Sequence, residues 1–409
     1  MSTANNRPAR LLTINTGSSS LKAACYRMAS AEHRALAIQI ERIGADDARM
    51  RIIGTDGSTL LDTQQELPDH AAALHALFDW LNAHEDQGTF DAVGHRVVHG
   101  GVHHREPQRI TPELVSALER LTAIDPDHLP QALSAIRTVG QAYPDVPQVA
   151  CFDTAFHRHM PAVAQRYPLP REYADAGVIR YGFHGLSYEY IMQALQAEDA
   201  SAAAGRVIVA HLGNGASMAA VRGGVSIETT MGFSPTGGLV MGTRTGDLDP
   251  SVVLYLLRAR GMTPNDASVL LNKEAGMRGV SGMSGDMRDL LEKEASDPRA
   301  AEAIDLFCYQ ARKWLGALAA ALGGVETLVF TGGIGEHAAP VRARICDGLD
   351  FLGIRLDSAR NAAHAPIISP NGSPATVRVM PTDEDLMIAR HTAHLLAEGG
   401  THAHDRLQI

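Results

Sequence analysis

Three short turns rich in glycine and hydroxyl side chains are the segments best suited to holding a phosphate group. The first, NTGSSS at residues 15–20, is followed by Lys22. Backbone N–H groups and hydroxyls in such a turn can cradle phosphate oxygens, although a Ser-rich hairpin turn without a ligand has the same composition. The sequence contains neither the GxxxxGKS/T motif of a P-loop nor the signature set of protein kinases, so a phosphate site here would use another frame.

The second turn, HLGNGAS at residues 211–217, offers glycines that let the backbone approach a ligand, with Asn214 and His211 as hydrogen-bond donors. An Asn-Gly hairpin turn explains the same residues without a ligand. The third turn, TGGIGE at residues 331–336, follows an apolar run and precedes a helical segment that begins near Pro340. Glycines in a strand–loop–helix setting admit a nucleotide. The spacing is not GxGxxG, which disfavours a dinucleotide-binding dehydrogenase.

Two arginines stand where a planar cation could grip anionic oxygens. Arg244 is surrounded by Gly, Thr, Pro and Asp in GFSPTGGLVMGTRTGDLDP (232–250), and Arg96 lies near the end of a predicted strand in GHRVVHGG. A guanidinium suits a transferring phosphoryl group better than an ammonium because its fork meets two oxygens at once. Arg96 could clamp a carboxylate whose alkyl tail meets apolar side chains. Either arginine could instead make a structural ion pair.

Acids and imidazoles also follow predicted strands. Asp153 closes an apolar strand and His184 sits in a turn beside Phe183. Such positions are typical of active sites, although a lone histidine is more often a satisfied core residue. Histidines 99, 103 and 104 could ligate a metal, but no carboxylate or cysteine spacing supports them. The run TDED at 382–385 offers carboxylates for Mg²⁺, with an acidic helix N-terminus as the rival interpretation.

These residues must be positioned by an alternation of short strands and longer helices. Apolar, β-rich runs predict strands at residues 11–15, 92–98, 149–152, 207–212, 327–330 and 376–380. Apolar residues at helical spacing predict helices at residues 112–121, 131–142, 188–197, 251–259 and 300–321. The alternation predicts an α/β protein in which most of the helices cover the sheets.

Part of this frame is repeated. Residues 10–26 (RLLTINTGSSSLKAACY) align without gaps with residues 206–222 (RVIVAHLGNGASMAAVR), and both segments read as strand, small-residue turn, strand. The match predicts two halves built on one plan, with two equivalent turns facing each other across a cleft. Chance similarity in so short a window is the alternative.

Length and composition bound the class of protein. A chain of 409 residues is longer than one core usually organises, so we expect two domains with an active site between them. The net charge of −10 gives no electrostatic basis for binding nucleic acid or an anionic membrane. The four scattered cysteines read as reduced thiols. The N-terminus lacks the apolar core of a signal peptide and no segment is apolar enough to span a bilayer, so we expect a cytoplasmic protein.

Three glycine-rich turns in a duplicated α/β frame describe the two-domain, ribonuclease H-like fold of the sugar kinase, Hsp70 and actin type. The motifs together closely resemble the acetate kinase family, the acetate and propionate kinases. Nine runs in family order between residues 11 and 391 carry the resemblance: INTGSSSLK, GHRVVHGG, FDTAFH, RYGFHGLS, HLGNGAS, GFSPTGGLVMGTRTGDLDP, GMRGVSGMSGDMRD, FTGGIGE and PTDEDLMIAR. Nine such runs in order are not a chance match.

The resemblance implies roles in binding MgATP. Asn15 and Glu384 would hold Mg²⁺, for which Mn²⁺ could substitute. Lys22 and one turn would contact the ATP phosphates, the turn being His211, Leu212, Gly213, Asn214 and Gly215. The nucleotide pocket would be lined by Asp286, Met287, Arg288, Gly333, Ile334, Gly335, Glu336 and His337.

The resemblance also implies roles at the reacting carboxylate. Arg96 would bind the carboxylate or its phosphoryl product, and Val98 and Pro235 would form the small apolar pocket for the alkyl group. His184 and Arg244 would stabilise the transition state of a direct in-line transfer, while domain closure excludes water. Asp153 would act as an acid/base or substrate-polarising residue. Since acetate is already ionised at neutral pH, an orienting role for Asp153 fits as well as a base.

One segment departs from the family pattern. Where the family commonly has a histidine in a run like LAPLHNP, this chain reads LTAIDPDHLP at residues 121–130, with Asp125 in place of that histidine unless His128 replaces it through a shifted loop. Losing a donor and gaining a carboxylate beside developing negative charge should slow transfer tenfold or more without compensation. We expect Leu186, Tyr188 and Asp383, which also differ, to be tolerated.

We therefore predict an N-terminal α/β domain at residues 1–157, completed by a C-terminal helix at 386–409, and a nucleotide-binding α/β domain at 158–385. The predicted activity is reversible, Mg²⁺-dependent transfer between ATP and acetate, giving ADP and acetyl phosphate. A propionate or butyrate kinase is the near alternative, since one methylene is worth only about 1–3 kcal/mol of discrimination. A non-catalytic nucleotide- or acyl-phosphate-binding regulator is the alternative of another class. The resemblance also implies a homodimer.

Overall fold

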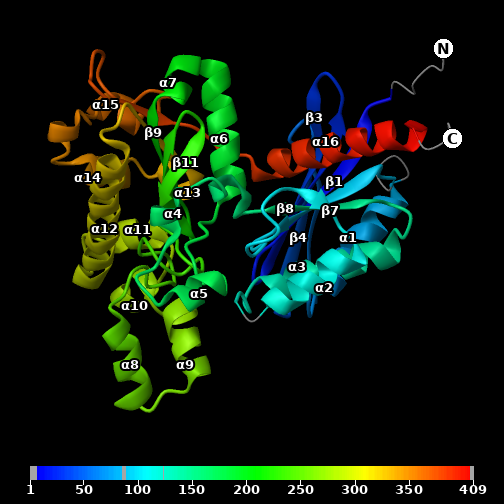
Figure 1. The fold of residues 1–409 in the computed structure, drawn as a ribbon, viewed down its shortest axis with the longest axis horizontal. Helices are drawn as coiled ribbons and strands as arrows, with labels where there is room; N and C mark the ends of the chain where they lie inside the picture. The colour runs from blue at the N-terminus through cyan, green and yellow to red at the C-terminus, as the bar shows by residue number, and fades with distance from the viewer. Residues whose placement is uncertain (1–6, 85–88, 123, 406–409) are drawn as a thin grey trace. The chain divides into compact units, whose positions relative to one another are not determined.

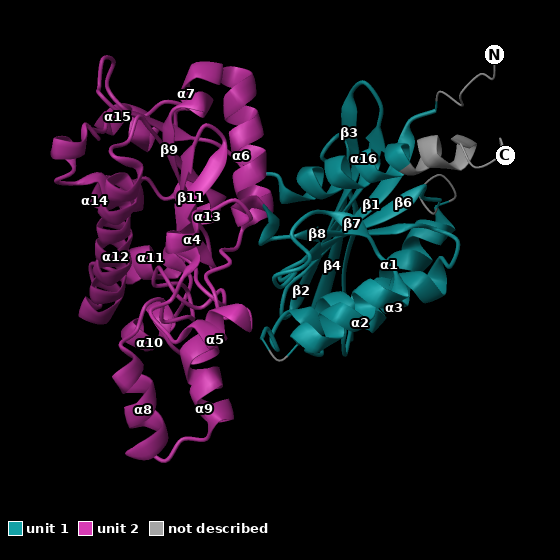
Figure 2. Cartoon of the chain, in the orientation of Figure 1, with its two compact units in different colours: residues 1–155, 383–409 teal, residues 156–382 magenta. Residues whose placement is uncertain are grey.

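The structure, a computed structural model, describes residues 7–84, 89–122 and 124–405, with residues 399–405 as backbone alone. The chain divides into two compact units, unit 1 (residues 1–155 and 383–409) and unit 2 (residues 156–382), drawn in different colours in Figure 2. These boundaries fall within three residues of the predicted domain boundaries at 157/158 and 385/386. The assignment of domains itself stays a prediction.

Unit 1 is built on one sheet in the order β5-β4-β3-β2-β1-β6-β8-β7. Its strands are β1 (Ala9–Thr16), β2 (Ser20–Met28), β3 (Glu32–Glu41), β4 (Ala48–Gly54), β5 (Thr59–Gln65), β6 (Ala92–Val97), β7 (Gln108–Arg109) and β8 (Gln148–Phe152). Strands β1 to β5 pair antiparallel in sequence order, whereas β1, β6 and β8 run parallel. The parallel strands place their C-terminal ends at one edge of the sheet.

The helices of unit 1 cover both faces of this sheet (Figure 1). They are α1 (His70–Ala83), α2 (Pro112–Leu121), α3 (Leu129–Ala142) and α16 (Glu384–Asp405). Alternate residues of β1 point to opposite faces of the sheet. Leu12 packs in one apolar cluster with α1 and α3, whereas Leu11 packs with Ala389 of α16. Helix α16 crosses β6 so closely that a Cβ on Gly94 would lie 2.3 Å from the Thr392 hydroxyl.

Unit 2 contains a five-stranded sheet in the order β11-β10-β9-β12-β13. Its strands are β9 (Arg206–Leu212), β10 (Ala216–Arg222), β11 (Val225–Thr229), β12 (Thr327–Thr331) and β13 (Thr376–Val379). Its helices are α4 (Ala162–Gln165), α5 (Arg171–Asp175), α6 (Gly185–Glu198), α7 (Ala200–Ala204), α8 (Pro250–Arg258), α9 (Pro264–Val269), α10 (Gly276–Ser281), α11 (Met287–Lys293), α12 (Pro298–Leu322), α13 (Gly332–His337), α14 (Ala339–Cys346) and α15 (Ser358–Ala362). Short 3-10 turns lie at Ala155–His157 and Asp350–Leu352, and a π-helical turn lies at Leu270–Glu274.

The long helix α12 shows how the sequence sets an element of unit 2. Asp297 caps its N-terminus by accepting from the backbone N–H of Arg299, and Pro298 fills the first turn. Gly323 ends it in a left-handed conformation, with φ at 73°. The helix packs on β9, β10 and β11. Helix α6 joins a separate apolar cluster with β9 and β10.

The predicted repeat is confirmed at the level of topology. The series β3-β2-β1-β6-β8 in unit 1 matches β11-β10-β9-β12-β13 in unit 2, each with an antiparallel hairpin followed by parallel strands. The hairpins differ by one residue, because Thr16 pairs with Leu21 across four intervening residues while Leu212 pairs with Ala216 across three. The α/β fold, with two sheets on one plan, is therefore confirmed.

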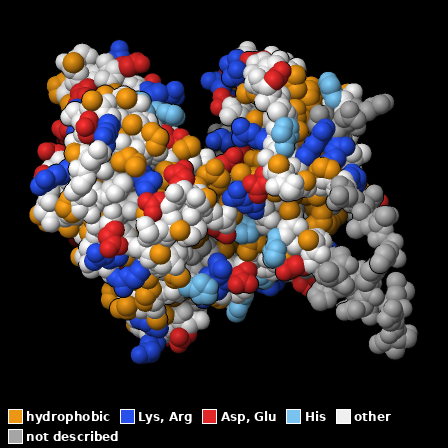
Figure 3. Space-filling model, turned by 90° about the horizontal axis from the view of Figure 1, so that it is seen from above, with side chains coloured by type: hydrophobic (Ala, Val, Ile, Leu, Met, Phe, Trp, Pro, Cys, Tyr) orange, Lys and Arg blue, Asp and Glu red, His pale blue; other side chains and the backbone are white. Residues whose placement is uncertain are grey.

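One local expectation was wrong. The third glycine-rich turn, expected as a loop before a helix near Pro340, is itself the short helix α13, which starts directly after β12. On the face drawn in Figure 3, acidic and basic side chains are interspersed. None of the helices in the described part of the chain has the length and apolar character needed to span a bilayer.

Candidate active site

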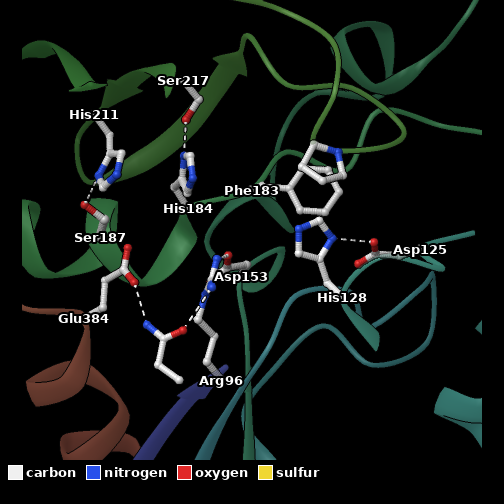
Figure 4. A network of polar contacts seen from close by, with 12 residues as sticks. Arg96, Asp125, His128, Asp153, Phe183, His184, Ser187, His211, Ser217 and Glu384 are labelled. Carbon is white, nitrogen blue, oxygen red and sulfur yellow. Dashed lines mark hydrogen bonds and ion pairs between the residues drawn. The ribbon is translucent and has the colours of Figure 1, made fainter. Parts of the chain in front are cut away.

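A buried arginine–carboxylate pair lies at the C-terminal edge of the unit 1 sheet. Arg96 of β6 pairs in register with Cys151 of β8, and Asp153 follows β8 directly. The Arg96 Nε donates to Asp153 Oδ1 at 3.0 Å, and its Nη2 donates to the other carboxylate oxygen (Figure 4). Asp153 is fully buried and the Arg96 side chain is 16% exposed. Such a two-pronged contact fixes the plane and direction of the guanidinium.

The pair extends into a chain of polar contacts through Asn15 at the end of β1. Asn15 Oδ1 accepts from Arg96 Nη1 at 3.1 Å, and its Nδ2 donates to Glu384 Oε2 at 3.2 Å. Glu384 is the first residue of α16, so three strand ends and one helix start meet here. The structure thus brings together four residues that the resemblance assigned to metal, substrate and catalysis, all within unit 1.

The charges of this network support one another. Burial opposes the charge of the Arg96 guanidinium, but the carboxylates of Asp153, Glu384 and Asp125 raise its pKa above the ordinary value. Asp385 behaves differently, since burial first, then the neighbouring charges of Asp383 and Glu384, raise the pKa of its carboxyl to about 7. The nearby cations Lys22 of β2 and Arg34 of β3 lower the pKa of Asp385 and offset only part of this rise.

The donor set at the start of α16 fits a hard divalent cation. Glu384 offers carboxylate oxygens, and the amide oxygen of Asn15 has a second lone pair besides the one that accepts from Arg96. Mg²⁺ is typically held by one or two protein oxygens, with waters and substrate phosphates as the other ligands. The described residues hold no cluster of three or more His, Cys, Asp or Glu side chains suited to a metal. Asn15 and Glu384 thus suit a metal that arrives with a nucleotide.

Two further predicted residues of unit 1 adjoin the network. Lys22 on β2 pairs in register with Asn15, which places its exposed side chain beside the end of β1. Val98 is buried directly after β6. Its supposed partner in an alkyl pocket, Pro235, belongs to unit 2, and that shared pocket stays a prediction.

The segment that departs from the family pattern forms a carboxylate–imidazole pair. Asp125 is buried, with 4% of its side chain exposed, and its Oδ1 lies 2.7 Å from Nδ1 of His128 (Figure 4). His128 is the residue just before α3. An aspartate thus stands where the family commonly has a histidine, and a histidine three residues later contacts it. That His128 takes the place of the family histidine stays a prediction.

In unit 2, His184 is held in a strained and fixed orientation. It precedes α6 with φ at 59°, a left-handed conformation that costs energy for a residue with a side chain and is often found at functional sites. Its Nδ1 lies 2.8 Å from the hydroxyl of Ser217 on β10, and Tyr188 hydrogen bonds to the same hydroxyl. The contact with Ser217 fixes the orientation of the ring, and with it the direction of Nε2.

His211 is oriented in the same way and stacks on His184, with ring centroids 4.4 Å apart. The Ser187 hydroxyl lies 2.8 Å from His211 Nδ1 (Figure 4). The same hydroxyl lies 2.9 Å from the Thr382 hydroxyl. The supporting serines, Ser187 and Ser217, were not singled out from the sequence. Serine is common at surfaces, and only pairing with the histidines distinguishes these two.

Arg244 converges on the same place. A Cβ built on Gly215 would lie 3.4 Å from His184 Nε2 and 3.7 Å from Arg244 Nη1, so the glycine turn, the imidazole and the guanidinium adjoin one another. Arg244 Nη1 donates to the Pro235 carbonyl at 3.0 Å. Gly276, with φ at 62°, leaves room for the Arg244 loop, since a Cβ there would lie 2.7 Å from the Arg244 carbonyl oxygen. The loop is thus anchored beside the turn.

The predicted nucleotide-binding segments of unit 2 line one cavity of about 450 Å³. Its walls come from the turn after β9, the start of α11 and α13: Gly213, Asn214, Asp286, Met287, Arg288, Gly333, Ile334 and His337 are among the lining residues. The volume lies in the range of small-molecule sites. Gly335 instead faces Phe330 of β12 and Ala210 of β9, and Glu336 accepts from the Gly332 N–H at 2.9 Å.

Arg342 was missed by the sequence analysis. It is fully buried and donates to the carbonyls of Gly335 and Glu336 at 2.8 and 2.9 Å, and to both the side chain and carbonyl of Asn361. It therefore fixes α13, one wall of the cavity. The signal was available, because Arg342 shares a face of α14 with the buried Val341 and Ile345.

The two sheets repeat one plan, and this arrangement is the fold of the sugar kinase and actin type. Comparison with known proteins narrows the class. A model of the Acetokinase family matches residues 10–390, and the chain belongs to this family. Membership of this family confirms the predicted class of enzyme, an ATP-dependent phosphotransferase.

The relatives match over nearly full length. An acetate kinase of Rhodopseudomonas palustris is 48% identical over 397 residues, covering 95% of this chain and 99% of the relative. A propionate kinase of Citrobacter rodentium is 42% identical over 400 residues, covering 95% and 98%. The crystal structure of Porphyromonas gingivalis acetate kinase superposes with a TM-score of 0.84 at 36% identity, covering 95% of this chain and all of that one. A Francisella tularensis propionate kinase gives 0.89 at 33% identity, with the same coverage.

Proposed function

We propose that this chain transfers a phosphoryl group reversibly between ATP and acetate, giving ADP and acetyl phosphate. The observation that carries the proposal is the buried Arg96–Asp153 pair with Asn15 and Glu384 at one sheet edge, a cation aimed and charged to hold a small carboxylate. Full-length similarity to acetate kinases supports the same conclusion.

The chemistry asks for positioning and charge neutralisation. A carboxylate oxygen forms a bond to the γ-phosphorus while the bond from that phosphorus to the β–γ bridging oxygen breaks, and ADP leaves with the electron pair. Because the acid is already a carboxylate, no proton is released or taken up. Asn15 and Glu384 would hold Mg²⁺, which supplies positive charge to the phosphate oxygens.

The proposed roles in binding the acid and the nucleotide fall to different units. In unit 1, Arg96 binds the carboxylate and Lys22 contributes a second positive charge. In unit 2, the 211–215 turn and the cavity beside α11 and α13 take the nucleotide. His184 and Arg244 stabilise charge on the transferring group, supported by their convergence at Gly215.

Asp153 acts as a positioning residue in this proposal. Both of its oxygens accept from the Arg96 guanidinium, and the acid substrate needs no base. Removing the carboxylate would therefore misdirect Arg96, and would not remove a proton acceptor.

Propionate is the second candidate acid. Propionate kinases are among the relatives at 42% identity and among the solved structures at a TM-score of 0.89. One methylene changes binding by about 1–3 kcal/mol, so both acids could be turned over at different rates.

We propose further that the protein acts in the cytoplasm as a homodimer. All four cysteines are buried and none forms a disulfide, as suits a reducing compartment. Helix α8 has no buried residue, and its Val252, Leu254 and Tyr255 are 39%, 45% and 55% exposed. Such an apolar face suits a second copy of the chain. A charge there, as in Tyr255→Glu, should shift the mass measured by light scattering from dimer to monomer, and an unchanged mass would argue against this surface.

The activity is tested by MgATP-dependent acyl-phosphate formation, trapped with hydroxylamine, with acetate, propionate and butyrate as acids and Arg244→Ala as the control. Turnover that disappears in the variant supports the kinase, and the fastest acid identifies the substrate. No turnover with any acid, while ATP still binds, would favour a nucleotide-binding regulator instead.

A further inference from the structure

The segment between α2 and α3 carries a buried carboxylate whose placement the fold alone does not explain. Asp125 is 4% exposed, one of its oxygens contacts His128, and the other is buried without a hydrogen-bond partner among the described residues. A carboxylate so close to a helix start commonly caps the helix. Here the described contacts of α3 include no side-chain cap. The Asp125 carboxylate instead contacts the imidazole of His128.

The backbone holds this pair firmly. Leu129, the residue after His128, is fully buried in an apolar cluster with Leu118 and Phe152. The Asp125 carbonyl accepts from the Leu129 N–H at 3.3 Å, and the His128 carbonyl accepts from the Ala132 N–H at 3.3 Å. The ring is therefore anchored from both sides, and Asp125 on Nδ1 sets its direction. Its Nε2 is the nitrogen not used by Asp125, and 18% of the side chain is exposed.

The charges around the ring connect it to the proposed acid-binding group. Asp125 is one of the carboxylates whose charge raises the pKa of Arg96, so it lies within electrostatic reach of that guanidinium. The loop itself carries two carboxylates, Asp125 in contact with the ring and Asp127, and the Arg96 guanidinium on which Asp125 acts is paired with Asp153. A carboxylate on one imidazole nitrogen holds the ring's orientation and stabilises the protonated form, as in hydrolase triads.

We propose that His128, oriented by Asp125, is a catalytic residue that donates from Nε2–H to the acyl phosphate. The proposal rests on the proposed function and adds a residue to it. In the complex, Nδ1 faces Asp125 and Nε2–H donates to an oxygen of the transferring group. No proton moves in the transfer itself. The aspartate at position 125 is then a support for the imidazole, and not the mark of a lost activity.

Two substitutions separate this role from a structural one. His128→Asn keeps a nitrogen where Nδ1 contacts Asp125 but has nothing at the position of Nε2. His128→Gln keeps a nitrogen at the position of Nε2 but loses the contact with Asp125. If the ring only satisfies Asp125, the Asn variant is the more active. If the ring donates to the substrate, the Gln variant is the more active.

The experiment measures ATP formation from ADP and acetyl phosphate by the full chain, with kcat and both KM values for each variant. We expect kcat/KM for acetyl phosphate to fall about 100-fold in His128→Asn and about tenfold in His128→Gln, with the KM for ADP within twofold. Asp127→Asn, which removes the other carboxylate of the loop, is the matched control and should stay within threefold. Thermal melting of each variant reports whether it is folded.

The outcomes are decisive. An Asn variant within threefold of the unsubstituted chain, or an Asn variant more active than the Gln variant, overturns the role of Nε2. If the unsubstituted chain forms no ATP from any acyl phosphate, the proposed function fails first, and this inference falls with it. The order Gln above Asn, with an unchanged KM for ADP, supports it.

Discussion

The two sheets share the order of five strands, yet in the proposed function they bind with different parts of the chain. In unit 1 the strand ends present side chains, and Asn15, Arg96 and Asp153 form a hydrogen-bonded series there. In unit 2 the equivalent places are glycine turns, where the backbone of Gly213 and Gly333 lines the cavity. A small carboxylate is held by a few directed charges, whereas a nucleotide needs room and N–H groups. One duplicated frame thus supports two kinds of site.

The largest effect should follow from removing the directed charge of unit 1. Arg96→Ala should lower kcat/KM for acetate about 1,000-fold, because both the carboxylate clamp and a source of transition-state charge are lost. Arg96→Lys should recover only part of this, since an ammonium cannot make the two-pronged contact with Asp153. The hydroxamate assay at varied acetate gives both values, and a loss under tenfold in the Ala variant would contradict the role.

The matching substitution in unit 2 should act on the nucleotide cavity indirectly, by displacing α13, which forms one of its walls. Arg342→Met removes a buried guanidinium that holds the carbonyls of Gly335 and Glu336, so the free energy of unfolding should fall by about 3–5 kcal/mol. Because α13 loses its anchor, the KM for ATP should rise while that for acetate stays the same. Arg344→Met, two positions along the same helix and partly exposed, is the control and should change stability by under about 1 kcal/mol. Equal effects of the two substitutions would refute a positioning role for Arg342.

A smaller effect, on the free energy of unfolding at acid pH, should arise in both units. Burial lowers the pKa of His95 in unit 1 and of His157 in unit 2 from 6.5 to about 4. Between these values the unfolded chain binds protons that the folded chain does not, so stability falls as the pH drops from about 6.5 to about 4. Each histidine contributes a slope of about 1.4 kcal/mol per pH unit within that window.

Replacing one of these histidines should remove its contribution to the slope of the free energy of unfolding against pH. His95→Gln, measured by denaturant unfolding at several pH values, should flatten the acid limb by about 1.4 kcal/mol per pH unit. His75→Gln, on α1 and exposed, is the control. An unchanged slope in His95→Gln would mean that His95 is not held neutral by burial.

The sequence predicted the fold from its strongest patterns. All six predicted strands and all five predicted helices are present, because each is a sustained apolar run or an amphipathic helix. The repeat of residues 10–26 at 206–222 correctly predicted the shared topology. The stretch from β3 to α1 was missed, although β3 shows the alternating burial of a half-buried strand. Alternation over a few residues is a weaker signal than a continuous apolar run.

The candidate site was predicted less completely. Motifs identified Arg96, His184 and Arg244, because such side chains stand out beside glycines and strand ends. The groups that orient them could not be found in this way, since Ser187 and Ser217 look like any surface serine until the fold pairs them with His211 and His184. Similarly, Asp125 reads as a departure in sequence, and only its contact with His128 shows what it supports.

The division of labour between the units is tested most directly by the affinity of Arg96→Ala for MgATP, measured by calorimetry on the full chain. Since we propose that Arg96 of unit 1 binds the carboxylate and that the cavity within unit 2 binds the nucleotide, we predict a Kd within about twofold of the unsubstituted protein while turnover with acetate is lost. A tenfold or greater loss of ATP affinity would contradict the account, because Arg96 would then serve the nucleotide as well as the acid.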